Sequence, residues 1–235
     1  MERFGFPVPI LPGKEDLPQQ IYQDMTGRMP EYVESRRNAG LTMERTYLQT
    51  NPDGSTLLVV YAEGKGTMGE VATAFATSAI PFDQWFMDVN QEASGIDFRQ
   101  PPPDGGPEHV ASWEAPSGAR GTGIALCAPL QAGKTDAGRA WAKEAFVNRR
   151  DELTGSRLAL GSTREEVFLN QTPMGDFAVV YIEGEDPVRV NREFAASNKS
   201  YDRWFKDSLR DIFPPIIDWD QPISPPEQLW DWQAS

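Results

Sequence analysis

Hydrophobic and polar positions follow the same order twice along the chain. Short apolar runs at Phe4–Ile10 and Thr122–Ala128 predict an opening strand in each half. A helix is predicted next, because apolar residues of the first half recur every three or four positions and so share one face. These residues are Leu17, Ile21, Met25, Met29 and Tyr32.

The two copies of this helix are expected to end differently. In the first half, Pro30 should kink the helix or split it after Gly27. In the second half, the equivalent helix is predicted through Trp141, Ala145 and Arg149–Leu153, and it is expected to end at Gly155.

A hairpin is predicted after the helix in each half. Its outgoing strands are Glu44–Thr50 and Arg164–Gln171, and its turns are Asn51–Gly54 and Thr172–Gly175, where Pro and Gly favour tight turns. The returning strands, Thr56–Glu63 and Phe177–Glu183, are almost continuously apolar. A strand without polar alternation is buried on both faces, so these two are predicted at the centre of a covered sheet.

The sharpest repeated pattern follows a short helix that carries Val71 and Phe75, or Val190 and Phe194. An aromatic residue, Asp, any residue, Trp and Phe recur in Pro81–Asp88 and in Ser200–Asp207, and each segment is predicted to be helical. Proline-rich crossings, Gln100–Pro103 and Gln221–Pro226, lead to the last strands. These strands are predicted at His109–Glu114 and Gln228–Trp232.

The equivalent segments are separated by about 120 residues throughout, which indicates a duplication. Strand, helix, strand, strand, helix and strand form the ferredoxin-like order βαββαβ, so the predicted class is α+β with two tandem modules. The predicted boundaries are 1–114 for the first module, 115–121 for a linker rich in small residues and 122–235 for the second. One sheet face of such a module has no helices over it, and two copies can cover each other there.

Net charge and the length of the apolar stretches exclude some classes of binding partner. A formal net charge of -13 over 235 residues argues against binding nucleic acid, which depends on Lys and Arg at the phosphates, and against docking on anionic membranes. No apolar stretch approaches the ~18 residues that span a bilayer, and no signal segment opens the chain, so a cytoplasmic location is expected. The single cysteine, Cys127, lies in an apolar run and is expected to be buried and inert.

The repeated segments resemble the dimeric α/β-barrel superfamily, which includes antibiotic-biosynthesis-monooxygenase-like proteins. The resemblance is carried by Val59–Tyr61 and Val179–Tyr181, by the two Trp-Phe helices, and by Asp-x-x-Gln-Pro at Asp97 and Asp218. The same elements resemble small bacterial proteins of unknown function that have one such module. The resemblance implies a pseudo-dimer within one chain, with a pocket in each module between its sheet and its helices.

Aromatic side chains are the first candidates for a ligand site. Trp85 and Trp204 could stack on a flat aromatic molecule, and the adjoining Phe86 and Phe205 are assigned to the same site. The alternative is that the Trp-Phe pairs are ordinary core residues. Hydroxyl groups at Tyr61 and Tyr181 on the central strands could also meet a ligand, or could simply close the strand ends.

Titratable candidates are few. Asp83 and Asp202 could act as acid–base groups, although a carboxylate in a first helical turn also favours the helix dipole. His109 is the only histidine, and Gln228 occupies its place in the second copy, so any proton transfer by it would be confined to one half. Arg36 and Arg37 lie near a helix end, and their positive charges are interpreted as stabilising the negative end of the helix dipole.

No cofactor or metal is expected, since the sequence has no histidine pair, cysteine cluster or carboxylate grouping with ligand spacing. The leading prediction is a module that binds a small apolar or aromatic molecule. A cofactor-independent monooxygenase or isomerase for an aromatic or polyketide-like substrate and a protein-interaction module without a ligand stay open as alternatives, so enzymatic activity is undecided. Because the copies differ at Gln84 and Arg203, and at Met87 and Lys206, we hypothesise that one half keeps the working site.

Overall fold

The computed structural model describes residues 1–100 and 106–234, and it divides the chain into two compact units. Unit 1 comprises Met1–Pro107 with Pro226–Ser235, and unit 2 comprises Glu108–Pro225. Residues 101–105, with most of the first predicted proline-rich crossing, and Ser235 lie outside the described residues.

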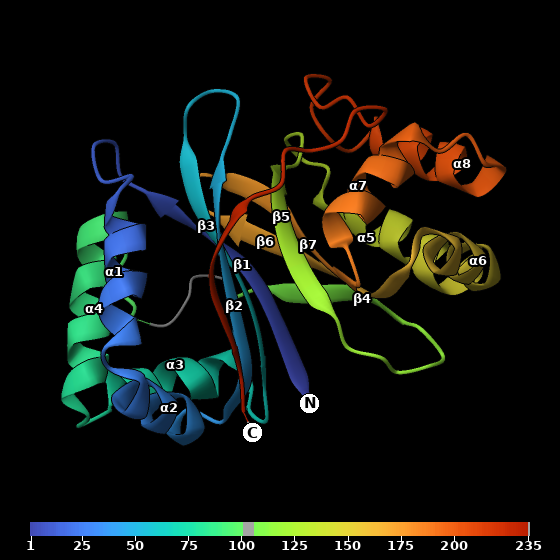
Figure 1. Ribbon diagram of the computed structural model, residues 1–235. Helices are drawn as coiled ribbons and strands as arrows, with labels where there is room; N and C mark the ends of the chain where they lie inside the picture. Colours follow the sequence, from blue (N-terminus) through green and yellow to red (C-terminus); the bar gives the residue numbers. More distant parts are fainter. Residues whose placement is uncertain (101–105, 235) are drawn as a thin grey trace. The chain divides into compact units, whose positions relative to one another are not determined.

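Unit 1 is an antiparallel sheet with helices over one face (Figure 1). Its strands are β1 (Glu2–Ile10), β2 (Leu41–Thr50), β3 (Thr56–Gly64) and β8 (Glu227–Gln233), in the order β1-β3-β2-β8. Its helices are α1 (Leu17–Thr26), α2 (Met29–Asn38), α3 (Met68–Ala76) and α4 (Pro81–Ser94).

Unit 2 repeats this arrangement. Its strands are β4 (Glu108–Glu114), β5 (Thr122–Pro129), β6 (Ser162–Thr172) and β7 (Gly175–Gly184), in the order β4-β6-β7-β5. Its helices are α5 (Thr135–Lys143), the π-helical turn η2 (Glu144–Asn148), α6 (Arg150–Leu160), α7 (Pro187–Ala196) and α8 (Ser200–Leu209). The two antiparallel sheets with their helices agree with the predicted α+β class.

The last strands are exchanged between the halves of the sequence. Strand β4 ends the first half but pairs with β6 of unit 2, and β8 ends the second half but pairs with β2 of unit 1. The observed units therefore differ from the predicted continuous modules 1–114 and 122–235. Residues 115–121, predicted as a linker between modules, join β4 to β5 inside unit 2.

The two central strands differ in burial: β3 has the nearly complete burial that its composition predicts, whereas partly exposed residues interrupt the buried ones along β7. β3 lies between β1 and β2, β7 lies between β5 and β6, and eight of the nine residues of β3 are buried. Alternate side chains of β3 point to opposite faces of the sheet. Leu58 and Ala62 join the core under the helices, whereas the intervening Val59 and Tyr61 are fully buried on the other face.

The first helical segment is split where the sequence predicts it. α1 ends at Thr26, and α2 starts at Met29 with Pro30 in its first turn, where a missing N–H costs little. The expected helix end at Gly155 is wrong, because α6 continues to Leu160 and ends at Gly161, whose φ is 83°. Buried contacts of Leu153 and Leu160 outweigh the poor helix propensity of one internal glycine.

The π-helical turn η2 accommodates a one-residue difference between the copies. Lys14 and Lys134 are equivalent, and so are Arg36 and Arg157, but the second copy has one more residue between them. A π-turn takes up one extra residue inside a helix, so the residues after the turn keep the direction that they would have without the insertion. Despite the insertion, α6 therefore turns the same side toward the sheet of unit 2 as α2 turns toward the sheet of unit 1.

Candidate functional site

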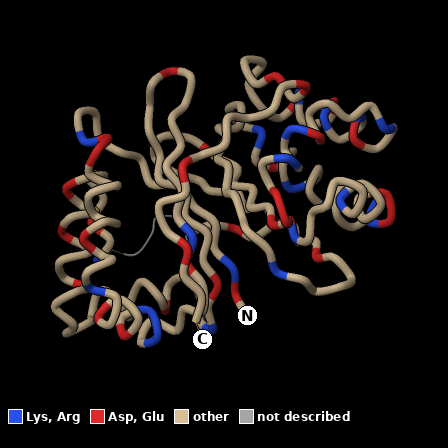
Figure 2. The backbone as a smooth tube through the Cα atoms, viewed as in Figure 1, with Lys and Arg blue, Asp and Glu red and all other residues tan. Residues whose placement is uncertain are grey.

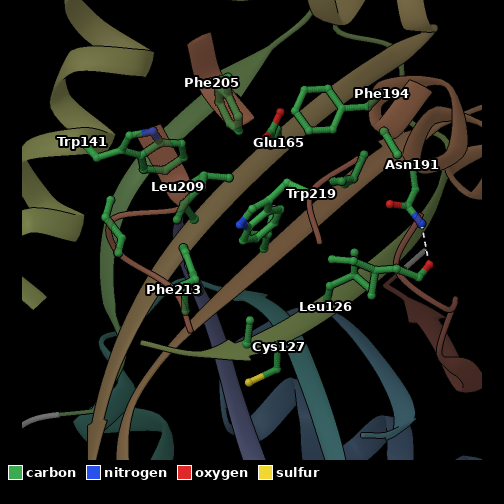
Figure 3. A pocket seen from close by; sticks show the side chains of 18 of the residues that line it. Leu126, Cys127, Trp141, Glu165, Asn191, Phe194, Phe205, Leu209, Phe213 and Trp219 are labelled. Atoms are coloured by element: carbon green, nitrogen blue, oxygen red, sulfur yellow. Dashed lines mark hydrogen bonds between the residues drawn. The ribbon is translucent and has the colours of Figure 1, made fainter. Parts of the chain in front are cut away.

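Each unit contains a pocket between its sheet and its helices. The unit-2 pocket has a volume of about 110 Å³ and the unit-1 pocket about 130 Å³. Both have mostly apolar walls, built from the central strands and from the helices. Figure 3 shows Trp141, Phe194, Phe205 and Trp219 around the unit-2 pocket.

A buried ion pair lies in the wall of each pocket. In unit 2, Arg157 of α6 donates through Nε to Glu165 Oε2 and through Nη2 to Glu165 Oε1 at 3.2 Å. In unit 1, Arg36 of α2 donates through Nε to Glu44 Oε2 at 2.7 Å and through Nη2 to Oε1 at 3.3 Å. This two-bond geometry is the strong form of the arginine–carboxylate contact.

Both pairs are removed from solvent. Arg36 is 1% and Glu44 6% exposed, and Arg157 and Glu165 are each 4% exposed. Burial by itself would lower the pKa of Arg36, but the charge and hydrogen bonds of Glu44 together with the nearby Tyr32 and Tyr22 outweigh it and hold this pKa above its usual value. The same opposition, with Glu165 as the partner, raises the pKa of Arg157. Each pocket wall therefore contains one buried arginine paired with one buried glutamate.

Aromatic rings surround the guanidinium groups. The guanidinium carbon of Arg157 lies 4.9 Å from the ring centre of Phe194 and 4.7 Å from that of Phe205. Arg36 lies 5.1 Å from Phe75 and 4.5 Å from Phe86, the equivalent residues of unit 1. Cations at this range are attracted to the negative ring face, so the rings hold the guanidinium planes in place.

Serine hydroxyls connect the unit-2 arginine to a buried aspartate. Arg157 Nη1 donates to Ser156 Oγ at 3.2 Å, and Ser156 Oγ donates to Asp202 Oδ1. Ser197 Oγ donates to the other oxygen of Asp202. Asp202 thus lies in the first turn of α8 as predicted, but it is fully buried and accepts two hydroxyl hydrogen bonds.

The unit-1 aspartate has a related but incomplete environment. Asp83 lies in the first turn of α4, is buried, and accepts a hydrogen bond from Ser78 Oγ. Its second oxygen, Oδ1, is buried and has no hydrogen-bond partner. Ser35 Oγ accepts from Arg36 Nη1 at 3.0 Å, as Ser156 does from Arg157.

The predicted aromatic ligand residues separate into two sets. Phe86 and Phe205 line their pockets. Trp85 and Trp204 do not, and each instead lies under an arginine. Arg28 is 4.7 Å from the Trp85 ring centre, and Arg149 is 3.8 Å from that of Trp204.

Tyr61 and Tyr181 line neither pocket, because they lie on the opposite face of their sheets. Tyr61 Oη donates to Glu63 Oε1 at 2.7 Å, and Tyr181 Oη donates to Glu183 Oε1 at 2.6 Å. Both rings are fully buried. Each tyrosine hydroxyl thus donates its hydrogen bond to a glutamate of its own strand.

His109 also lies outside the pockets, on β4. Its Nε2 is 2.8 Å from Glu166 Oε2, and its ring stacks on Phe168 with 4.7 Å between the ring centres. The side chain is partly exposed, while Glu166 is fully buried. His109, Asp83 and Asp202 are therefore not brought together by the fold into one catalytic group.

The buried arginine–glutamate pairs are the features that the sequence interpretation missed. Arg36 was assigned to the helix dipole, and it does lie in the last turn of α2, but its side chain is buried and paired with Glu44. A signal was present in the repeat. Ser-Arg occurs at Ser35 and at Ser156, and Glu follows the arginine at the same spacing of eight residues in both copies.

Several other expectations concern the whole chain. Charged residues occur along the helices of both units (Figure 2). Cys127 is buried as predicted, and burial raises the pKa of its thiol. Among residues 1–100 and 106–234, no helix is long and apolar enough to cross a membrane, and no three potential ligands from His, Cys, Asp and Glu converge as for a metal ion. A cytoplasmic location stays a prediction.

Comparison with known proteins finds similar folds among solved structures and no match by sequence. No protein-family model matches the chain, and no curated protein matches it significantly. A solved structure of an anthrone oxidase-like protein superposes with a TM-score of 0.54 and 11% identity, covering 100% of this chain and 94% of that one. A candidate monooxygenase from Lactobacillus acidophilus NCFM superposes with a TM-score of 0.51 and 6% identity, covering 99% of this chain and 97% of that one.

These likenesses support the predicted resemblance at the level of fold. Both neighbours are monooxygenase-like proteins of the antibiotic-biosynthesis-monooxygenase-like fold, and both extend over nearly the whole chain. The two four-stranded antiparallel sheets fit a tandem α/β module. At these identities the likeness extends to the fold alone.

Proposed function

We propose that this protein binds a small, flat, mostly apolar molecule in a pocket between sheet and helices. The observation that carries the proposal is the pocket itself, which has aromatic and aliphatic walls and a single neutralised ion pair. Mostly apolar walls with few fixed polar groups are typical of small-molecule sites. Because Arg157 and Glu165 cancel each other's charge, the pocket favours a neutral ligand.

An oxygenase reaction in the same pocket is the second candidate. It is favoured by the names of the two structural neighbours, an anthrone oxidase-like protein and a candidate monooxygenase. With anthrone, the balanced reaction would consume one O₂. The methylene group would lose two hydrogen atoms, one oxygen atom would form the new carbonyl, and the other would leave as water.

We also propose that the units correspond to the two modules of a dimeric α/β barrel. Each unit contributes a four-stranded antiparallel sheet with its own helices, and this repetition supports the proposal. The exchanged strands β4 and β8 would then tie the modules together within one chain.

Binding can be tested with anthrone as the probe, by equilibrium dialysis against the full chain. Ala178 lines the unit-2 pocket, so Ala178→Phe should fill it and weaken binding about tenfold or more. Ala62 lines the unit-1 pocket, so Ala62→Phe should fill that pocket and serves as the matched variant. If anthrone does not bind, or if neither variant weakens it, the small-molecule proposal is wrong and a protein-interaction role gains support.

The oxygenase candidate needs a separate readout. An oxygen electrode should record uptake of one O₂ per anthrone above the buffer blank, and this uptake should be lost in the variant that blocks binding. Binding without oxygen uptake would leave the carrier function and remove the oxygenase.

A further inference from the structure

The two pockets differ at two positions that carry hydrogen-bond donors in unit 2. Ser162 is 2% exposed and lines the unit-2 pocket, and its Oγ has no hydrogen-bond partner. Trp219 also lines this pocket, and its Nε1 is buried without a partner. Figure 3 shows the Trp219 ring in the middle of the pocket view.

The equivalent positions of the unit-1 pocket are apolar. Leu41 opens β2 and Ser162 opens β6, and they lie opposite Gly64 and Gly184 of the central strands. Phe98 and Trp219 each follow an aspartate whose carbonyl accepts from the backbone N–H of Gln100 or Gln221 at 3.0 Å. The repeat thus places Leu41 and Phe98 where unit 2 has a hydroxyl and an indole N–H.

Two buried donors without acceptors are unusual in a folded protein, because leaving such a group unpaired costs free energy. Apolar residues occupy the same two positions in unit 1, so the fold does not require donors there. A bound molecule with oxygen acceptors would satisfy both groups.

The chain segment that carries Trp219 is fixed to the rest of unit 2, which keeps the indole in position. Asn191 Nδ2 donates to the carbonyl oxygen of Ile223 at 2.6 Å, and Gln131 Nε2 donates to that of Phe213 at 2.6 Å. Between them, Lys206 Nζ is 2.7 Å from Asp220 Oδ1. Unit 1 has Ala72 and Met87 in place of Asn191 and Lys206, so this attachment belongs to unit 2.

We propose that the unit-2 pocket, and not the unit-1 pocket, binds the ligand, and that the ligand is a flat aromatic molecule bearing carbonyl or phenolic oxygens that accept hydrogen bonds from Ser162 Oγ and Trp219 Nε1. This inference rests on the proposed function. It adds the chemical class of the ligand and the half of the chain that holds it.

The test compares two probes of nearly the same shape. Anthrone carries a carbonyl oxygen, and 9,10-dihydroanthracene lacks it. Dissociation constants are measured by equilibrium dialysis for the unmodified protein, for Ser162→Ala and for Trp219→Phe. Leu41→Val and Phe98→Leu are the matched unit-1 controls, and urea unfolding shows that each variant is folded.

Anthrone should bind the unmodified protein at least about tenfold more tightly than the hydrocarbon, because the hydrocarbon leaves the buried donors unpaired. Each unit-2 variant should weaken anthrone binding about three- to tenfold and leave the hydrocarbon nearly unaffected. The unit-1 controls should change neither constant.

The failures of the two proposals differ. If neither probe binds, the proposed function is wrong and this inference falls with it. If both probes bind equally well and the unit-2 variants have no effect, the small-molecule function stands and the inference is overturned. It is likewise overturned if the unit-1 controls weaken binding as much as the unit-2 variants do.

Discussion

At the scale of single residues, the most distinctive feature is a charge pair inside an apolar wall, present once in each unit. Removing both ions from water costs several kcal/mol, so such a pair is not in itself a source of stability. Its geometry is nevertheless the same twice, with a serine beside the arginine and phenylalanine rings over it. We interpret the pair as a fixed polar element in a pocket that otherwise offers apolar contacts.

Breaking one side of the unit-2 pair should be costly, while replacing both sides should not. Glu165→Gln leaves the buried Arg157 charge without its counter-ion, and is expected to lower the free energy of unfolding by about 3–5 kcal/mol. The double variant Arg157→Met with Glu165→Leu removes both charges, so its free energy of unfolding should fall far less than that of the single variant, or should rise. Urea unfolding of the single and double variants measures both, and equal losses in the two would contradict the expectation.

Sequence periodicity could place the Trp-Phe helix but not choose between its neighbouring rings. Trp85 and Phe86 are adjacent, and successive side chains on a helix point about 100° apart, so only one of them can face the pocket directly. Phe86 and Phe205 take that direction. The large tryptophan rings are covered instead by Arg28 and Arg149, which directly precede α2 and α6 and are far from the tryptophans in sequence, so no local pattern reveals these contacts.

At the scale of elements, helix α6 continues past a glycine and ends at another, and the two glycines should respond oppositely to substitution. A Cβ at Gly155 would meet nothing within 4 Å, whereas Gly161 has a φ of 83° that disfavours any side chain. Gly155→Ala should therefore stabilise the protein by about 0.5–1 kcal/mol. Gly161→Ala should destabilise it by about 1 kcal/mol.

Thermal or urea unfolding of the two alanine variants provides this comparison. A destabilised Gly155→Ala variant would mean that α6 is strained at its centre, contrary to its continuous helical geometry from Arg150 to Leu160.

The segment that carries Trp219 should have its own acid sensitivity. Hydrogen bonds from Lys206 and Arg210 hold the pKa of Asp220 below its usual value. A carboxyl whose folded-state pKa is lowered stabilises the fold above its ordinary pKa, and this contribution disappears as the pH falls through the lowered value. The attachment should thus be unchanged from pH 7 to 5 and weaken only below about pH 4.

The indole N–H signal of Trp219 in an NMR titration reports this attachment. In Asp220→Asn, the signal at pH 7 should already have the chemical shift that the unmodified protein shows below about pH 4, and this shift should change little with pH. A Trp219 signal that shifts between pH 7 and 5 in the unmodified protein would speak against the role of Asp220.

At the scale of the whole molecule, the order of elements could be predicted from the repeat but the partner of each last strand could not. Strands β4 and β8 carry buried residues at alternating positions, Ala111 and Trp113 in one and Trp230 and Trp232 in the other. Strands with the same alternation fit the edge of either sheet, so the local sequence does not specify which edge each one joins. Exchange of equivalent elements keeps the same kinds of contact, as in domain swapping.

Engineered disulfides can distinguish exchanged from unexchanged strands. Leu48 of β2 lies opposite Glu227 of β8, so Leu48→Cys with Glu227→Cys should form an intramolecular disulfide. Leu48→Cys with Glu108→Cys is the matched control, because Glu108 lies opposite Leu169. Peptide mapping under non-reducing conditions identifies the bond, and cross-linking of the control pair alone would show that the strands are not exchanged.

The most direct test of the account follows the indole N–H signals of the seven tryptophans while anthrone is added to ¹⁵N-labelled protein. Trp141 and Trp219 line the unit-2 pocket, and Trp85 and Trp204 line neither pocket. A ligand in the unit-2 pocket should shift the signals of Trp141 and Trp219 and leave those of Trp85 and Trp204 in place. Shifts at Trp85 or Trp204 with an unchanged Trp219, or no shifts at all, would contradict it.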